Sequence, residues 1–190
     1  MEALSKNAIV SISIALEAVL LLVAAVWMVC ANIQLLSKFQ FAPVAIGWGL
    51  ALAAATTTVS ILCVTLGKRL AFLSDLKKMS EELLAPLLAK LGPGDIVFLS
   101  LVSGFCEEVF FRGIVQAQCG LWATSIAFGV FHDPSFKQKS YVILAALAGL
   151  GLGYLYQQTA NLWSCITAHA VHNLLAMLAL RYWIKPSEAP

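Results

Sequence analysis

The sequence has 190 residues, of which 61% are hydrophobic and 12% charged, with a formal net charge of +2 and a mean hydropathy of +0.87. Soluble domains are about half apolar and about one quarter charged, so this composition excludes an ordinary soluble protein and predicts an integral membrane protein. No basic patch that could bind nucleic acid is visible, and the partner that the composition predicts is the lipid bilayer.

The length and the cysteine distribution limit the architecture further. A helical bundle of this size can enclose one central cavity, and no segment resembles an additional soluble domain, so we expect a single membrane domain over residues 1–190. The five cysteines are scattered singly through apolar segments. They lack the close spacing of a zinc site or a disulfide framework, and we interpret them as small packing residues.

Two long apolar segments, at residues 8–36 and 44–66, predict the first two membrane spans. The first is longer than the core of a secretory signal and lacks a small-residue cleavage site, so we expect it to remain in the protein. It carries an acidic residue, Glu17, which pairing with another helix or a position near the interface would explain. The second segment is rich in alanine and threonine, which permit close packing between helices.

Residues 67–95 form the one extended polar stretch of the chain. Five basic residues are interleaved there with leucines and other apolar residues at helical spacing, a pattern that predicts an amphipathic helix lying in the membrane interface. Gly92, Pro93 and Gly94 mark the end of this helix.

A third span is predicted at 96–118, and Gly120 separates it from an apolar run at 121–131. At about 1.5 Å per residue this run covers only about half of the ~30 Å of hydrocarbon. The polar residues at 132–140 therefore either border a water-filled cavity or complete the crossing as buried irregular chain, which membranes tolerate only away from lipid. Either arrangement brings water close to His132.

The last two spans are predicted at 141–156 and 162–182, which places the candidate functional residues in a core at about 96–182. With six spans, nearly all lysines and arginines fall on one side of the membrane, as the positive-inside rule requires for a bundle with both termini in the cytoplasm. The expected fold is therefore all-α: a polytopic membrane helix bundle of about six transmembrane spans and one interfacial amphipathic helix, with a polar intramembrane cavity.

The polar cavity follows from the depths of several unusual residues. Counting ~1.5 Å per residue from the span ends places Glu107 and His132 about 16 Å deep. His172 and Asn173 lie about 15–16 Å deep by the same count, with His169 one turn closer to the outside. A charged group at the bilayer centre costs at least ~2.5–3.5 kcal/mol, so it requires a partner, water or a function. We therefore expect these residues to line one shared cavity that is open to the cytoplasm.

Helical spacing separates the two neighbouring glutamates. Glu108 and Arg112 are four residues apart and can form an ion pair on one face, whereas Glu107 is rotated by about 100° and stays available as a base. His169 and Asn173 are also four residues apart, as an oxyanion-stabilising pair or two ligands would be. A carboxylate that activates water beside such donors predicts hydrolysis of a peptide bond.

Three motifs, in this order, carry a resemblance to a known family. Residues 107–112 read EEVFFR and match EExxxR, residues 128–132 read FGVFH and match FxxxH, and residues 169–173 read HAVHN and match HxxxN. Together they resemble the CAAX-protease and bacteriocin-processing (CPBP, Abi-type) family of intramembrane endopeptidases, related to the type II CAAX prenyl endopeptidase (Ras-converting enzyme). The resemblance covers the second half of the chain.

The resemblance implies a multi-pass peptidase of the bacterial type, in the plasma membrane, that cleaves a membrane-anchored protein or peptide without a metal cofactor. It also implies a role for each motif residue: water activation for Glu107 and His132, the oxyanion site for His169 and Asn173, and support of the first of these helices for Glu108 and Arg112. His172 lies outside the family pattern, so its role stays open.

Three alternatives stay open at this level. Glu107, His132 and His169 could instead hold a divalent ion such as zinc, which would make the protein a metal-dependent peptidase. Buried acids and histidines also occur in proton-coupled transporters, but these predict internal repeats, and no convincing repeat relates the two halves of the chain. The third alternative is a non-catalytic membrane partner that keeps the fold.

Overall fold

The computed structural model describes residues 4–184, and every regular element within that range is helical, which confirms the predicted all-α class. Four helices are long and apolar enough to cross a membrane singly. They are α1 (Lys6–Cys30), α2 (Pro43–Leu66), α7 (Lys139–Thr159) and α8 (Leu162–Tyr182). Many large apolar side chains of these helices are exposed on the outer surface, as in a multi-pass protein that meets lipid there.

The first span ends earlier than the sequence predicted. Helix α1 stops at Cys30, because Asn32 has a φ of +52°, in the left-handed region that interrupts a helix and that asparagine tolerates. A short 3-10 helix, η1 (Leu36–Lys38), follows. Helix α2 then begins with Pro43, a residue whose fixed φ suits the first turn of a helix.

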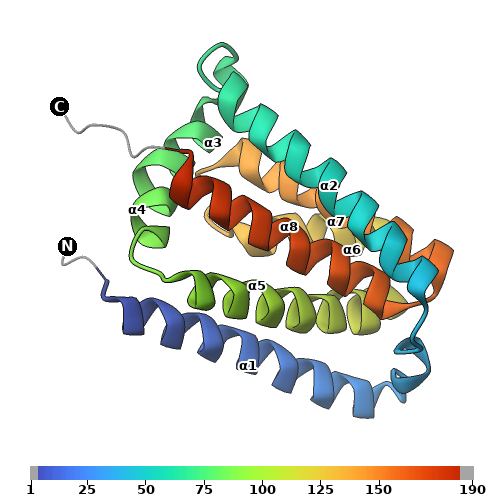
Figure 1. Cartoon of the computed structure of the whole chain (residues 1–190). Coiled ribbons are helices and arrows are strands. Elements are labelled where there is room, and N and C mark those ends of the chain that lie inside the picture. The colour runs from blue at the N-terminus through green and yellow to red at the C-terminus, as the bar shows by residue number, and fades with distance from the viewer. Residues whose placement is uncertain (1–3, 185–190) are drawn as a thin grey trace.

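The predicted amphipathic helix is confirmed as a series of short helical segments that covers one end of the bundle (Figure 1). The segments are η2 (Ala71–Leu73), α3 (Ser74–Lys78), η3 (Met79–Leu84) and α4 (Ala85–Leu88), of which η3 is π-helical. Leu76, Met79 and Leu88 are buried, whereas Lys78 and Glu82 are exposed. The stretch bends by 117° from the helices that follow it.

The third span continues through three elements, α5 (Pro93–Glu108), η4 (Val109–Val115), which is π-helical, and α6 (Gln116–His132). The predicted break at Gly120 is confirmed, since this residue has a φ of +75°, which glycine adopts without steric cost. The chain folds back between Glu107 and His132, because these side chains lie 3.8 Å apart, whereas a straight helix would separate the residues by about 37 Å.

The folded-back arm explains why fewer individual spans are found than the six that the sequence predicted. After Gly120 the helix continues only to His132, a length of about 18 Å, which is too short to cross a membrane. By length and composition, the bent stretch from Ala71 to His132 adds at most one further span to the four. The arm ends beside Glu107 and so brings His132 into the bundle.

Helix α8 is central to the bundle, with α2, α5 and α7 packed against it and α1 on the far side of α5 (Figure 1). Two glycines let neighbours come close to it. A side chain at Gly49 in α2 would collide with the Ser164 carbonyl oxygen of α8, and the Cβ of one at Gly104 in α5 would lie 2.7 Å from the Ala170 Cβ. These approaches confirm the predicted tight packing of the second span and bring polar residues of different helices together.

Candidate active site

Glu107 and His132 face each other inside the bundle. Glu107, near the end of α5, is 7% exposed, and His132 is the last residue of α6. The His132 Nε2 atom lies 3.8 Å from the Glu107 Oε2 atom, too far for a direct hydrogen bond but close enough for one water molecule to bridge. His132 Nδ1 lies 2.8 Å from the Phe128 carbonyl oxygen. Because a carbonyl only accepts, Nδ1 carries the hydrogen, and Nε2 is left towards Glu107.

Glu108 is completely buried and joins two other predicted site residues. Its Oε1 atom accepts hydrogen bonds from Arg112 Nη1 at 3.1 Å and from His169 Nδ1 at 2.8 Å. The structure thus contains the ion pair that helical spacing indicated and adds a contact to α8 that the sequence did not reveal. Glu108 therefore connects the first motif to the third.

Arg112 is also completely buried, and three neighbours surround its guanidinium group. Besides the bond to Glu108, its Nη2 atom donates to the Gly149 carbonyl oxygen at 3.0 Å. The guanidinium carbon lies 4.6 Å from the centre of the Phe128 ring. A buried charge costs several kcal/mol unless it is paired and hydrogen-bonded, so these contacts explain how Arg112 is tolerated. They also tie η4 to α6 and α7.

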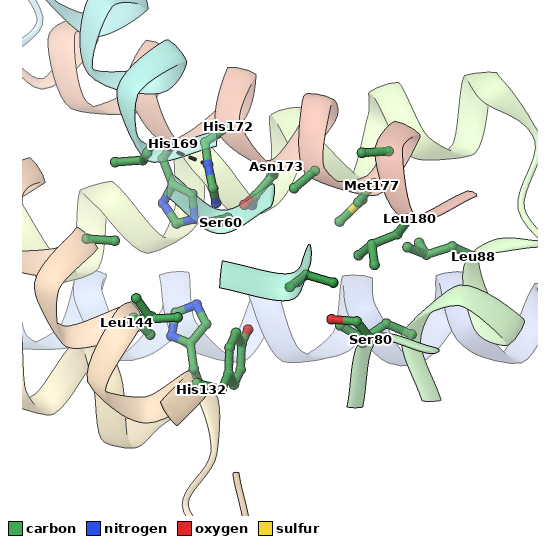
Figure 2. A pocket seen from close by; sticks show the side chains of 18 of the residues that line it. Ser60, Ser80, Leu88, His132, Leu144, His169, His172, Asn173, Met177 and Leu180 are labelled. Atoms are coloured by element: carbon green, nitrogen blue, oxygen red, sulfur yellow. Dashed lines mark hydrogen bonds between the residues drawn. The ribbon is translucent and has the colours of Figure 1, made fainter. Parts of the chain in front are cut away.

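His169 and Asn173 lie one turn apart on α8 and line the same cavity as His132 (Figure 2). His169 is 4% exposed, and because its Nδ1 atom is bonded to Glu108, Nε2 is the ring nitrogen left for a ligand. The Asn173 Nδ2 atom donates to the Ser103 hydroxyl oxygen at 2.9 Å, which uses one of its two amide hydrogens. His169 therefore keeps one ring nitrogen, and Asn173 one amide hydrogen, for another contact.

His172, whose role the sequence left open, is held by helix α2. Its Nδ1 atom lies 3.1 Å from the Thr57 hydroxyl oxygen and 3.2 Å from the Thr56 hydroxyl oxygen. The ring also lines the cavity, beside His169 and Asn173 (Figure 2). The two threonines therefore give His172 a part in fastening α8 to α2.

A cavity of about 360 Å³ extends from these polar side chains towards α3 and α4. Three histidines and Asn173 line one end, with His132 on the side opposite the α8 residues (Figure 2). Leu88, Met177 and Leu180 line the other end. Pockets of this kind, mostly apolar with a few convergent polar groups, are typical ligand sites.

Several polar residues of this region were not identified from the sequence. Tyr141, at the start of α7, lines the cavity, and its ring lies 5.9 Å from the His132 ring. Thr56, Thr57 and Ser103 hold the α8 residues by their hydroxyl groups. The signal that could have found them is their depth, since a hydroxyl group in the middle of an apolar span requires a hydrogen-bond partner.

A polar contact at the bundle end fastens α3 to α7. The Asp75 carboxylate accepts a hydrogen bond from the Ser140 backbone N–H at 3.1 Å and a second from the Ser140 hydroxyl group. Burial acts to raise the pKa of Asp75, but the hydrogen bonds from Ser140 outweigh it and hold the pKa below its ordinary value. The contact lies next to Leu76 and Tyr141, which both line the cavity, and so fixes the position of α3 at that end of the cavity.

The described residues give no support to a metal centre. Within residues 4–184, no three or more histidine, cysteine, aspartate or glutamate side chains gather closely enough to hold a metal ion. Glu107, His132 and His169, the ligand set considered for zinc, do not form such a group. Residues 4–184 therefore contain no preformed cluster of metal ligands.

Comparison with known proteins is informative for the second half of the chain. Residues 90–175, which contain all three motifs discussed above, match the family model described as type II CAAX prenyl endopeptidase Rce1-like. Over 87 residues the chain is 32% identical to the uncharacterized protein YpbD of Bacillus subtilis (strain 168), covering 46% of this chain and 46% of that protein.

The chain thus spans about half the length of the curated relative it matches. No solved structure matches. On the family match and the motifs within it, residues 90–175 of this chain are similar to the type II CAAX prenyl endopeptidase Rce1-like family.

Proposed function

We propose that this protein is an intramembrane endopeptidase of the CAAX type, which hydrolyses a peptide bond of a membrane-anchored protein or peptide with water activated by Glu107 and His132. The observation that carries the proposal is the 3.8 Å separation of these side chains, which come from two different helices, and His132 lines a cavity inside the bundle. The family match of residues 90–175 supports endopeptidase activity at the level of the family.

In the first step, a water molecule held between the two side chains attacks the carbonyl carbon of the substrate. Glu107 takes one proton of the water, the new C–O bond forms, and the carbonyl π electrons move onto the carbonyl oxygen. His132 orients the water with Nε2, and the Nδ1–H bond to Phe128 holds the ring in place. A positioned base of this kind contributes roughly 10²–10⁴ to the rate.

His169 and Asn173 stabilise the negative charge that develops on that oxygen. Asn173 has a second Nδ2 hydrogen besides the one given to Ser103. His169 can donate from Nε2 only as an imidazolium, since Nδ1 already donates to Glu108, and the hydrogen bond to the Glu108 carboxylate favours that charged form. Glu108 and its partner Arg112 thus act through His169, as positioning residues.

In the last step the tetrahedral intermediate collapses. The C–N bond breaks, its electron pair goes to the nitrogen, and Glu107 returns the proton to the leaving amine. Because one carboxyl group serves first as base and then as acid, it is regenerated after each cycle.

We further propose that the end of the bundle covered by α3 and α4 faces the cytoplasm of a bacterial cell. Basic residues gather at that end, among them Lys68, Lys77 and Arg181, whereas Lys38 lies between α1 and α2 at the opposite end. This asymmetry follows the positive-inside rule. In this orientation α1 begins and α8 ends on the cytoplasmic side of the plasma membrane. All the helices belong to one membrane domain, and the substrate enters the cavity from the cytoplasmic side.

The first test compares the membrane peptides of cells that express the wild-type protein with those of cells that express Glu107→Gln. Peptides that accumulate in the variant are then incubated with purified protein in liposomes. Glu107→Gln keeps the size of the side chain but removes the base, so we expect the cleavage rate to fall by about 10²–10⁴. His132→Ala should have a similar effect. Glu82→Gln makes the same change at an exposed position and should cleave like the wild type.

Both site variants must insert into the membrane and stay monodisperse in detergent for this comparison. Full cleavage by Glu107→Gln would overturn the glutamate-base mechanism. Identical peptide profiles for the wild type and both glutamate variants would point to a non-catalytic membrane partner or a transporter. Activity that is lost on chelation and restored by an added ion would favour the metal-dependent peptidase.

A further inference from the structure

Glu17 lies on the buried face of α1, and the mechanism above does not use it. The buried residues of α1 are Leu20 and Ala24, at 7% and 3% exposure. They follow Glu17 by three and seven positions, a spacing that puts all three residues on one face of the helix. The Glu17 Oε2 atom is itself buried. Glu17 therefore faces the protein and not the lipid.

Helix α1 runs beside α5 in the same direction (Figure 1). Two contacts fix the register of the pair: Lys6 Nζ lies 2.8 Å from Asp95 Oδ2, and the rings of Trp27 and Phe110 are 6.3 Å apart. Counting along both helices from these contacts puts Glu17 opposite residues 100–106. Since Glu107 follows this stretch directly, the two carboxyl groups lie at about the same depth in the bundle.

Glu17 and Glu107 each have one buried carboxylate oxygen, Oε2, without a hydrogen-bond partner among residues 4–184. Leu21, one turn after Glu17 on the same face of α1, packs in one cluster with Val109, which lies two residues after Glu107. Two ionised carboxylates side by side in an apolar interior repel each other strongly, and such pairs bind one proton between them. One shared proton would satisfy both unpartnered oxygens.

We infer that Glu17 is a positioning residue for the proposed hydrolysis: its carboxyl group shares one proton with Glu107, directly or through one water molecule, and holds the Glu107 carboxylate towards His132. This role rests on the proposed function, whereas the pairing of the two carboxyl groups does not. A carboxylate oxygen accepts two hydrogen bonds, so Glu107 Oε2 can accept one from Glu17 and one from the water. The shared proton stays on the pair, and only the proton of the water passes to the leaving amine.

Two substitutions separate this hydrogen-bond role from a packing role. Glu17→Gln keeps a neutral donor of the same size, whereas Glu17→Leu has a similar size and no donor. In liposomes, we expect kcat to fall about tenfold in Glu17→Leu and less than about threefold in Glu17→Gln, with KM unchanged, which is the size of effect that one hydrogen bond carries. The unfolding temperature of Glu17→Leu should not fall, because leucine suits an apolar surrounding.

A matched control adds the same leucine elsewhere on α1. Ser11→Leu changes an exposed residue of this helix and should keep the wild-type kcat. Wild-type kcat in Glu17→Leu would overturn the inference. An equal loss of kcat in Glu17→Leu and Glu17→Gln would overturn it as well, since the amide donor would then fail to replace the carboxyl group.

Infrared spectroscopy tests the pairing without any cleavage. A protonated carboxyl group gives a carbonyl stretching band that shifts in D₂O, and we expect a band in the wild type that disappears in Glu17→Gln and changes position in Glu107→Gln. The absence of such a band from the wild type would overturn the shared proton. A band in a protein that cleaves no peptide would support the pairing while the proposed function fails.

Discussion

The two ends of the cavity are built from different chemistry. At the polar end, His132, His169 and Asn173 are each held through one nitrogen by a hydrogen bond to a neighbouring group. At the other end, the wall consists of apolar side chains such as Leu88 and Leu180, whose contacts have no preferred direction. The fold thus orients the groups that would carry out chemistry, and it leaves the opposite wall to be defined by shape alone.

This difference predicts different consequences of substitution at the two ends. The polar end contains the buried ion pair of Glu108 and Arg112 and several directed donors, so losing one of these partners should lower stability or the rate of catalysis strongly. The apolar end has no such partners, so a change there should alter how the substrate fits and leave the chemical step intact.

The largest effect is expected for the buried ion pair. Arg112→Met leaves the Glu108 charge buried without its cation, which should lower the free energy of unfolding by about 3–5 kcal/mol. Unfolding in mixed detergent micelles measures this loss. The double variant Glu108→Gln, Arg112→Met removes both charges and should recover most of the stability. A double variant as unstable as Arg112→Met would show that the unpaired charge of Glu108 does not cause the loss of stability.

A slightly smaller effect is expected at the oxyanion site. Asn173→Ala removes one donor aimed at the developing charge, so kcat should fall by about 10²–10³ with little change in KM. Steady-state kinetics in liposomes measures both constants. Ser103→Ala, which removes only the group that holds Asn173, should cost less. Unchanged kcat in Asn173→Ala would remove this residue from the proposed mechanism.

At the apolar end of the cavity, we expect a substitution to change KM and to leave kcat unchanged. Ala176→Phe narrows the cavity beyond Asn173 and should raise KM roughly tenfold while kcat stays near the wild-type value, since overpacking costs about 1–3 kcal/mol and the polar end is untouched. Leu175→Phe, one residue earlier on an exposed face of α8, is the control. A loss of kcat without a change in KM would mean that the two ends are not independent.

The smallest effect concerns the contact between α3 and α7. The hydrogen bonds from Ser140 hold the pKa of Asp75 below its ordinary value of 3.8, so the contact stabilises the fold above that pH and weakens as the pH falls through the lowered pKa. Amide exchange at the start of α7 should therefore become faster below about pH 4. Asp75→Asn cannot titrate, so its exchange should lack this pH dependence. The same acid-dependent change in both proteins would assign it to another group.

Much of the fold could be predicted because the relevant signals are local. The α8 boundaries at Leu162 and Tyr182 coincide with the predicted span, since an apolar run of this length leaves little choice and Asn161 caps the start of the helix. The break at Gly120 was equally local. The predicted end of the first span was wrong. Whether Asn32 takes a left-handed conformation depends on the surrounding structure and not on residue type alone.

Depth along each span was also readable from the chain, which is why residues as distant as Glu107 and His132 were expected at one level. The roles of Glu107, His132, His169 and Asn173 in a reaction stay predictions. The contacts that these residues make with neighbouring helices could not be predicted. Nothing in the spacing indicated that Glu108 would bond to His169 or that two threonines of α2 would hold His172.

By itself, the sequence determined a membrane protein, its helical segments and the depth at which its polar residues lie, because hydrophobicity and the rise per residue act along one chain segment at a time. Only the tertiary structure decided which helix stands beside which and how each is rotated about its axis. Those choices depend on the packing of side chains that are far apart in sequence, such as Gly104 against Ala170, and they turn residues of similar depth into partners.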